Sequence, residues 1–536
     1  MTALILLNVP WGLIGLSKDR QELPTADAQL ETRSVIAPLL FCDNDHETFL
    51  NGRSDELERF VGIRTRLHER QSVWDIPVPL QADEQQALRH NTWRSDINFQ
   101  WVHGIDRPSH RGEEEEEGSQ EPGGPWYLFL MAVLARMQDF KAALQDGKDP
   151  WDYVLERWIN PAVGRDPTMD IVVRHAREHR ARWADIAEHP RRILNRRREL
   201  VPLSQVQELD TQCMQWLSRQ PGETLAERAG GRQRILALAR FENRNTLENR
   251  VFLDLLQRTV GASREYLTLN AGRDKGPLSR RTTRYAIVQQ FGRECRRLSL
   301  TLEEQGVTRS SDVVQPNYVL LHDSRYRDVW SARQEMIHRE RAMDDLWRWQ
   351  RRSWAEFCKA MLVMALLAQS NRVHLVAASP IFFRAEHRRG EWLMHDDPLA
   401  VIAHDDRGWV VELLGGNSTD VPDKMKELGA SIWVRFSDFT GGKYQYLPIW
   451  TVHSFSIDVS LADLVESAND AYRYLRDKAM LAGGVVFLST INPDQPMATQ
   501  AAEYVTGFAF GPWDAQLTGA LERIGEELSD FIESKI

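Results

Sequence analysis

Short apolar runs separated by turn residues characterise the first part of this chain of 536 residues. Positions 3–9 and 35–42 are runs of this kind and predict strands, while Trp74 and Pro77 mark irregular chain after them. The sequence therefore predicts a β-rich N-terminal domain over residues 1–110.

Between residues 126 and 367, apolar residues recur every three or four positions, which is the spacing of helices with one buried face. Gly147 and Pro150 end the first of these segments, because glycine and proline break helices. A basic helical domain is therefore expected over 126–367. The predicted helices cover residues 126–144, 203–217, 234–259, 284–304 and 329–367.

After Ser370 the pattern shifts to short apolar runs typical of strands, and these alternate with helical segments. The alternation predicts an α/β C-terminal domain over residues 368–536. Strands are expected at 373–378, 381–384, 399–404, 409–414, 432–436, 446–451 and 484–489, and helices at 422–428, 461–480 and 512–536.

Five consecutive glutamates lie between the first two regions, flanked by glycine and proline in residues 111–125. Such a stretch cannot bury apolar surface and its charges repel one another, so it predicts a flexible acidic linker. An acidic segment that occupies a basic groove of the same chain is the alternative. The whole pattern predicts an α+β multidomain protein with a β-rich N-terminal domain, a helical middle domain and an α/β C-terminal domain.

Composition narrows the class of protein. Hydrophobic residues make up 42 % and charged residues 27 % of the chain, close to the average of globular proteins. The four cysteines are far apart in the sequence, which argues against a disulfide framework and a zinc ribbon. No apolar run approaches the roughly 20 residues that a membrane-spanning helix needs. We therefore expect a soluble, cytoplasmic protein.

Basic residues are concentrated in the middle of an acidic chain. The net charge is −10, yet residues 161–300 hold 27 Arg and Lys against 16 Asp and Glu, so this window carries +11 and the remainder −21. Arginine, whose planar fork suits phosphate, accounts for 57 of the 67 basic residues. The pattern favours nucleic-acid binding, but codon bias, a solvated face, or a surface complementary to the chain's own acidic part are alternatives. The candidate nucleic-acid contacts are Arg174, Arg177, Arg191, Arg192, Arg196, Arg197, Arg280, Arg281 and Arg284.

The segment 243–256 holds a polar motif followed by an apolar stripe. Thr246 is a suitable cap for a helix that begins near residue 247, and Glu248 lies in its first turn, where a negative charge is favourable. Glu248 and Arg250 are two positions apart, so they do not face each other on a helix and each needs its own partner. Two interpretations stay open: a helix start held by internal polar bonds, or a role in positioning nucleic acid or a partner.

Thr246, Glu248, Asn249 and Arg250 resemble the "dT-x-ENR-fvk" signature of an uncharacterised domain family that accompanies McrC-type restriction subunits and related phage-defence nucleases. The resemblance covers about residues 185–367, roughly a third of the chain. It implies a restriction or anti-phage role, an AAA+ NTPase or helicase partner, and a C-terminal domain of the PD-(D/E)XK nuclease fold. Further segments that resemble this family lie at 189–194, 209–211, 217–221, 315–318 and 347–367.

A nuclease of that fold needs an Asp at the start of one strand and an acidic residue with a Lys in the next, and its two carboxylates hold Mg²⁺. Asp397 precedes the expected strand 399–404, and Glu412 lies in the strand after it. Leu414 stands where the Lys is expected, so Lys424 on the following helix is the candidate replacement. The alternatives are a surface hairpin, a degenerate inactive domain, and an active centre with Mg²⁺ on Asp397 and Glu412.

Three functions are compatible with these features. The first is a component of a bacterial anti-phage defence or restriction system that binds DNA, or RNA, through its arginines and carries a degenerate nuclease-like domain. Because the chain has no Walker motif, nucleotide hydrolysis would fall to the AAA+ NTPase or helicase partner. The second is an active Mg²⁺-dependent DNA endonuclease, and the third is a non-catalytic protein-interaction scaffold.

Overall fold

The structure, a computed structural model, is a mixed α+β protein that forms two compact units. Unit 1 comprises residues 1–109, 120–168 and 340–536, and unit 2 comprises residues 110–119 and 169–339. The structure describes residues 4–14, 20–23, 29–32, 36–43, 48–52, 59–60, 63–67, 71–78, 86–90, 97–101, 125–159, 170–270, 284–369, 373–386, 390–440, 443–456, 459–475, 480–493 and 495–535.

Residues 111–124 of the predicted linker lie outside this description. The helices of residues 125–159 and 350–367, which the sequence pattern groups with the middle domain, belong to unit 1. None of the described helices combines the length and the apolar character that a bilayer crossing requires.

The N-terminal part of unit 1 consists of two five-stranded sheets, which confirms its β-rich character. Leu7, Leu39, Phe41 and Val73 form a small core on the first sheet. The first sheet has the order β2 (Arg20–Glu22), β1 (Leu4–Leu7), β4 (Leu39–Cys42), β8 (Ser72–Asp75), β7 (Ile63–Arg66). The second has the order β3 (Gln29–Thr32), β10 (Ile97–Trp101), β9 (Gln86–His90), β5 (Thr48–Gly52), β6 (Arg59–Phe60).

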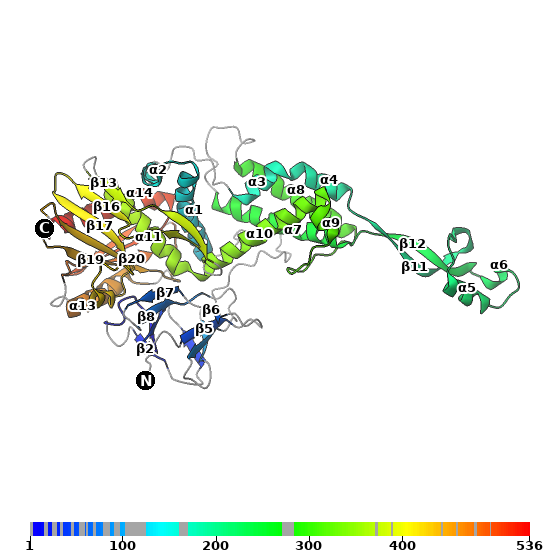
Figure 1. The fold of residues 1–536 in the computed structure, drawn as a ribbon, viewed down its shortest axis with the longest axis horizontal. Coiled ribbons are helices and arrows are strands. Elements are labelled where there is room, and N and C mark those ends of the chain that lie inside the picture. The colour runs from blue at the N-terminus through cyan, green and yellow to red at the C-terminus, as the bar shows by residue number, and fades with distance from the viewer. Residues whose placement is uncertain are drawn as a thin grey trace. The chain divides into compact units, whose positions relative to one another are not determined.

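A mixed eight-stranded sheet forms the C-terminal part of unit 1 (Figure 1). The strands from β13 to β19 are antiparallel neighbours, whereas β19, β20 and β22 run parallel. The predicted strand positions of this region are confirmed to within a few residues. In sheet order the strands are β13 (Val373–Ala378), β16 (Ala400–His404), β17 (Trp409–Gly415), β18 (Ile432–Asp438), β19 (Gln445–Val452), β20 (Gly484–Ser489), β22 (Val505–Phe510) and β21 (Ala498–Ala501), and β14 (Phe382–Glu386) and β15 (Gly390–Met394) form a separate pair.

Helices cover both faces of the eight-stranded sheet. Successive residues of a strand point to opposite sides, so a buried strand places apolar side chains on both faces and each face needs a cover. In β20, Phe487 contacts Phe510 on the side of α11, while Val486 and Leu488 join the core under α13. Helices α11 and α14 pack together on the first side, with α1 and α2 against them. The helices are α1 (Pro125–Gln145), α2 (Pro150–Ile159), α11 (Gln350–Leu367), α12 (Asp423–Lys426), α13 (Leu461–Leu475) and α14 (Asp514–Glu533).

A neutral histidine is sealed inside this sheet. The two ring nitrogens of His453, which follows β19, lie 3.1 Å from Ser489 Oγ and 2.9 Å from Gln350 Oε1. Burial, with Arg351 nearby, lowers the pKa of His453 to about 3. Both nitrogens have hydrogen-bond partners, and burial, which penalises the charged form, keeps the ring neutral.

The free energy of unfolding of this sheet should therefore fall as the pH falls below 6.5. In that range the unfolded chain binds a proton at His453 and the folded chain does not, which costs about 1.4 kcal/mol per pH unit. Between pH 8 and pH 5 we expect His453→Gln to show a pH dependence about 2 kcal/mol smaller than that of the wild type. Hydrogen exchange of the β19 and β20 peptides across a urea series measures this difference, and equal pH dependence in both proteins would contradict the assignment.

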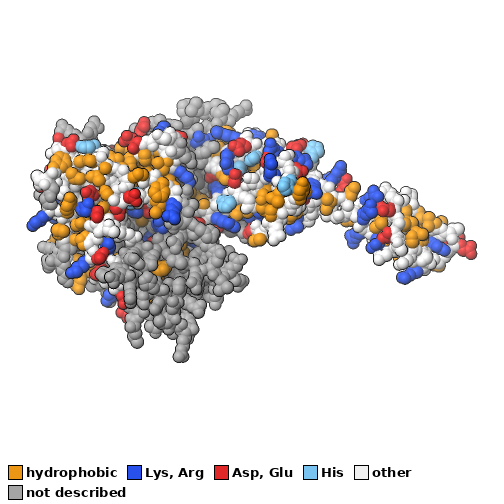
Figure 2. All heavy atoms as spheres, in the orientation of Figure 1, with side chains coloured by type: hydrophobic (Ala, Val, Ile, Leu, Met, Phe, Trp, Pro, Cys, Tyr) orange, Lys and Arg blue, Asp and Glu red, His pale blue; other side chains and the backbone are white. Residues whose placement is uncertain are grey.

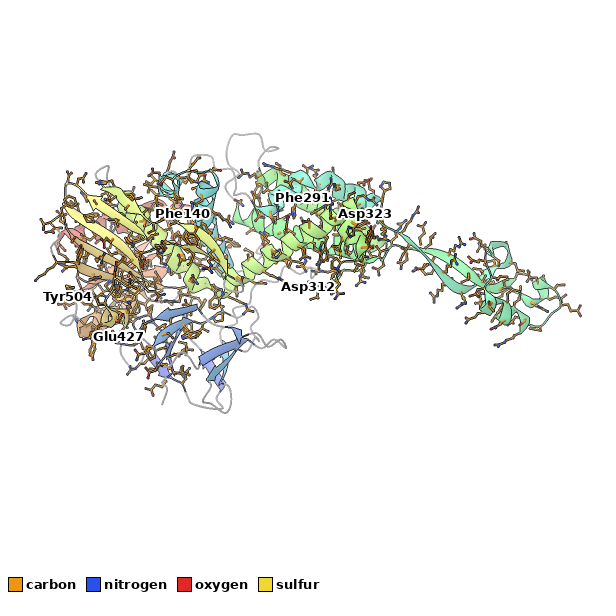
Figure 3. All side chains as sticks on the ribbon, viewed as in Figure 1. Phe140, Phe291, Asp312, Asp323, Glu427 and Tyr504 are labelled. Atoms are coloured by element: carbon orange, nitrogen blue, oxygen red, sulfur yellow. The ribbon has the colours of Figure 1, made fainter. Side chains whose placement is uncertain are left out.

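Unit 2 is a bundle of helices from which one hairpin departs (Figure 1). Its core joins α7 to α8, α3 and α4, and includes Phe252, Phe291 and Trp183. The ring centroids of Trp183 and Phe291, the latter labelled in Figure 3, are 5.4 Å apart. The helices are α3 (Ile171–Glu178), α4 (Arg180–Glu188), α5 (Thr211–Ser218), α6 (Leu225–Arg228), α7 (Leu247–Leu269), α8 (Arg284–Glu304), α9 (Tyr318–His322) and α10 (Ser324–Arg348), which passes into unit 1 after Arg339.

The hairpin corrects the purely helical prediction for the middle of the chain. The predicted helix 234–259 is a strand, β12 (Arg234–Asn243), followed by α7, and the preceding basic segment is the strand β11 (Ile193–Pro202). Long-range pairing decides this outcome, since β11 supplies hydrogen-bond partners along all of β12. The predicted helix 203–217 is a 3-10 turn, Leu203–Gln205, followed by α5.

Candidate functional site

The hairpin is the most exposed structured segment of unit 2, and we call residues 193–243 the arm. β11 and β12 pair in one continuous antiparallel register, from Ile193 with Asn243 to Pro202 with Arg234. Most side chains of β11 are exposed, among them Leu194 at 65 % and Leu200 at 52 %. The arm therefore presents apolar and charged side chains to its surroundings along most of its length, as Figure 2 shows.

A small cluster holds the far end of the arm. Leu217 of α5 packs with Ala229 and Ile235. Within β12, Ile235 and Ala237 are the only buried residues. Asp210 caps α5, and Thr224 forms a capping box with Glu227 at the start of α6. Because an isolated two-stranded hairpin is marginally stable in water, this cluster is what keeps the distal strands paired.

The near end of the arm is held by one buried amide. Asn249 Nδ2 donates hydrogen bonds to the carbonyls of Arg191 and Arg244, both at 2.7 Å, and these residues flank the two strands. Asn249 Oδ1 accepts from the Arg191 backbone N–H at 3.2 Å and from the Tyr326 hydroxyl at 2.7 Å. One side chain thus ties the residue that precedes β11 and the residue that follows β12 to the first turn of α7. We call these contacts the Asn249 clamp.

The other residues of the motif support the same junction. Thr246 caps α7, and the buried carboxylate of Glu248 accepts from Asn317 Nδ2 at 2.7 Å and pairs with Arg191. Burial raises the pKa of Tyr326, so its hydroxyl stays protonated and donates to the clamp. Arg250 differs, because its buried Nε has no hydrogen-bond partner among the described residues. The motif is therefore a helix start held by internal polar bonds, and it also positions the arm.

Most of the predicted nucleic-acid contacts are engaged within unit 2. Five of the nine arginines form ion pairs there, and Arg284 also has a partner, whereas Arg177 is exposed and has no ion-pair partner in the part of the chain that the structure describes. Arg280 and Arg281 lie outside the described residues. The pairs are Arg174–Glu335 at 2.7 Å, Arg191–Glu248, Arg192–Glu242 at 2.8 Å, Arg196–Glu208 at 3.3 Å and Arg197–Glu199 at 3.6 Å.

Two of the three predicted catalytic residues, Asp397 and Glu412, have separate partners. Asp397 Oδ1 accepts from the Gly415 backbone N–H at 2.9 Å, whereas Glu412 pairs with Arg435 on the neighbouring strand. Lys424 is exposed on α12. The part of the chain that the structure describes contains no cluster of three His, Cys, Asp or Glu side chains able to hold a metal ion. Asp397 and Glu412 are thus each engaged by a neighbouring group of the protein.

A different set of charged groups surrounds Asp397. His395 Nδ1 lies 3.9 Å from Asp397 Oδ1, and His395 lines a small pocket together with Lys359 of α11. Lys359 Nζ lies 3.1 Å from Glu356 Oε1. Burial, and next the charge of Lys359, lowers the pKa of His395. Sequence spacing misses this set because α11 comes from well before the strand pair and only the fold brings it there.

No family model and no curated protein matches the chain. One solved structure to which it is similar is a refined half-complex from a tetradecameric assembly of Thermococcus gammatolerans McrB AAA+ hexamers with bound McrC. The sequence identity is 11 %, the aligned region covers 87 % of this chain and 85 % of that chain, and the TM-score is 0.20. At this TM-score the likeness does not define a shared fold.

Loss of the clamp should loosen the arm. Asn249→Ala leaves the Arg191 carbonyl and the Tyr326 hydroxyl proton without a partner, and each unsatisfied buried group costs about 1–3 kcal/mol. It also removes one of the two partners of the Arg191 N–H and of the Arg244 carbonyl. We expect the free energy of unfolding of unit 2 to fall by several kcal/mol. Hydrogen exchange should accelerate at the near end of the arm, where β11 begins and β12 ends. The exposed ion pair of Arg192 provides the matched control, since Arg192→Gln should change stability by about 0–1 kcal/mol. Equal exchange in the two variants would contradict the clamp.

Proposed function

We propose that this chain is an accessory subunit of a bacterial restriction or anti-phage defence system, which binds an AAA+ NTPase or helicase partner through the arm and nucleic acid through unit 2. In this proposal the C-terminal domain is a degenerate nuclease-like scaffold. The observation that carries the proposal is the exposed arm, clamped at its base by the motif that resembles the McrC-associated family.

Two features of the arm support a protein partner. Exposed leucines and Phe241 alternate with arginines and carboxylates along both strands, so the surface offers apolar contacts surrounded by charge. A two-stranded ribbon also has little core of its own, and burial of these side chains against a partner would add the stability that the ribbon lacks.

The nature of the partner comes from the resemblance of residues 243–256 to domains that accompany McrC-type subunits. The chain itself has no Walker motif, so nucleotide hydrolysis requires a second protein. An AAA+ NTPase or helicase encoded beside this chain is therefore the first partner to test.

Substitution of exposed leucines on the arm should weaken the complex. Leu194→Glu and Leu200→Glu each place a charge in the proposed interface without disturbing a buried site. We expect each to weaken binding of the neighbouring AAA+ protein at least about tenfold, or about 1.4 kcal/mol, in biolayer interferometry. Val313, which is 88 % exposed in the same unit, gives the control Val313→Glu. Unchanged affinity of both arm variants, or equal loss in the control, would contradict the proposal.

The purified chain should leave supercoiled plasmid intact in the presence of Mg²⁺. The reason is that Glu412 pairs with Arg435 and Asp397 accepts from the Gly415 backbone N–H, so each carboxylate already has a partner within the protein. An agarose-gel assay of the wild type, Asp397→Ala and Glu412→Ala measures this directly. Cleavage by the wild type that disappears in both variants would show an active centre and refute the degenerate scaffold.

A further inference from the structure

Helix α8 has two opposite sides of different character. Its buried side carries Val288, Phe291, Cys295, Leu298 and Leu302, which pack into the core of unit 2. Its outward side carries Arg293, Arg296 and Arg297, all exposed. Spacings of three and four residues align these arginines on one helical face. We call them the α8 arginine face.

The positive charge of this face is free. None of its three guanidinium groups has an ion pair or a hydrogen bond among the described residues. The one acidic residue between them, Glu294, is already bound to Arg180 of α4, with 2.5 Å between Arg180 Nε and Glu294 Oε2. Arg196, Arg197 and Arg198 of β11 differ from this, because each forms an ion pair with an acidic neighbour.

The ion pair between Arg180 and Glu294 also fixes α3 and α4 beside α8. Arg177, which lies one turn before Arg180, is likewise exposed and has no carboxylate partner among the described residues. Exposed arginines without an ion pair among the described residues also lie elsewhere in unit 2, at Arg219, Arg232 and Arg234 of the arm and at Arg264 of α7. The α8 arginine face is distinguished from these by the alignment of three such side chains on one helical face.

From this placement we propose that the α8 arginine face binds the phosphate backbone of duplex DNA. Each guanidinium can hold a phosphate through two parallel hydrogen bonds, and unpaired arginines release counterions from the duplex when they bind. The inference rests on the proposed function and deepens it, since that function assigns the chain to a system directed against invading DNA. In this inference the α8 arginine face takes the place of most of the nucleic-acid contacts predicted from the sequence.

The composition of the α8 arginine face favours duplex DNA over a protein partner or a single strand. A protein interface has an apolar or aromatic centre, yet Leu300 is the only exposed apolar side chain among residues 293–300, all of which the structure describes. Binding of single strands relies on aromatic side chains that stack on bases, and residues 293–300 contain no exposed aromatic side chain. Contact with the backbone of a duplex needs neither feature.

The test is the salt dependence of DNA binding by the full-length chain. Fluorescence anisotropy with a labelled duplex between about 50 and 200 mM salt gives the slope of log K against log salt concentration. Replacing Arg293, Arg296 and Arg297 together by Gln, which keeps helix propensity, should lower the magnitude of this slope by about 2.7, or roughly 0.9 per lost phosphate contact. The affinity at the lower salt concentration should fall by more than about tenfold.

The matched control is a triple variant of the arm, in which Arg192, Arg196 and Arg198 are replaced by Gln. It removes the same charge from residues whose charge is compensated by Glu242, Glu208 and Asp210. Its slope should stay within about one unit of the wild type, because no phosphate contact is lost. An equal or larger change in the control, or an unchanged slope in the α8 variant, would overturn the proposal.

Two further measurements separate this inference from the proposed function. A wild-type chain that binds its AAA+ partner but no duplex DNA would overturn the inference and leave the arm proposal in place. Loss of partner binding in the α8 variant would also overturn it, because the face would then belong to the protein interface. Duplex RNA of the same sequence, if it bound more than about tenfold tighter than DNA, would overturn the choice of DNA.

Discussion

The arrangement of unit 2 depends on the side-chain amide of Asn249. An amide has two donors and one acceptor with two lone pairs, and here all of them are used: the donors bind the carbonyls that precede β11 and follow β12, and the oxygen accepts from Arg191 and Tyr326. No aliphatic or charged residue of similar size offers this combination. The direction of a long exposed hairpin is consequently set at one buried point, and the rest of the arm is free to present its side chains outward.

Further along α7, a buried carboxylate connects α7 to other segments of unit 2. Asp254 accepts from Arg258, Arg309 and Arg333 at 3.0, 2.8 and 2.7 Å and is inaccessible to solvent. Such a network is costly to break because removal of one member leaves a buried charge uncompensated. Arginine therefore has two structural roles in this unit, inside the core and along the arm, and a count of positive charge cannot distinguish these from a role at a ligand. The excess of basic residues in the sequence is thus only partly an interaction surface.

The sequence predicts the helices and strands in which burial of apolar side chains alone sets the hydrophobic pattern. The strand 484–489 and the helix 284–304 agree with the structure because one continuous stripe of buried apolar residues defines each. It fails for β12, because Arg234–Asn243 contains Ala, Leu and Arg, which favour helices, and its partner strand lies more than thirty residues earlier. For the catalytic candidates it misses a cross-strand partner. The spacing of Asp397 and Glu412 is compatible with a metal site, but the cross-strand register places Arg435 opposite Glu412.

The arm and the α8 arginine face can be occupied at the same time because unit 2 keeps them on different elements. The clamp uses the first turn of α7, whereas the arginine face lies on the side of α8 that faces away from the shared core. Contacts between α7 and α8 are apolar and buried, so substitution of an exposed arginine on α8 leaves the packing around Asn249 intact. The proposed binding of a protein partner to the arm and of DNA to α8 requires this independence of the two surfaces.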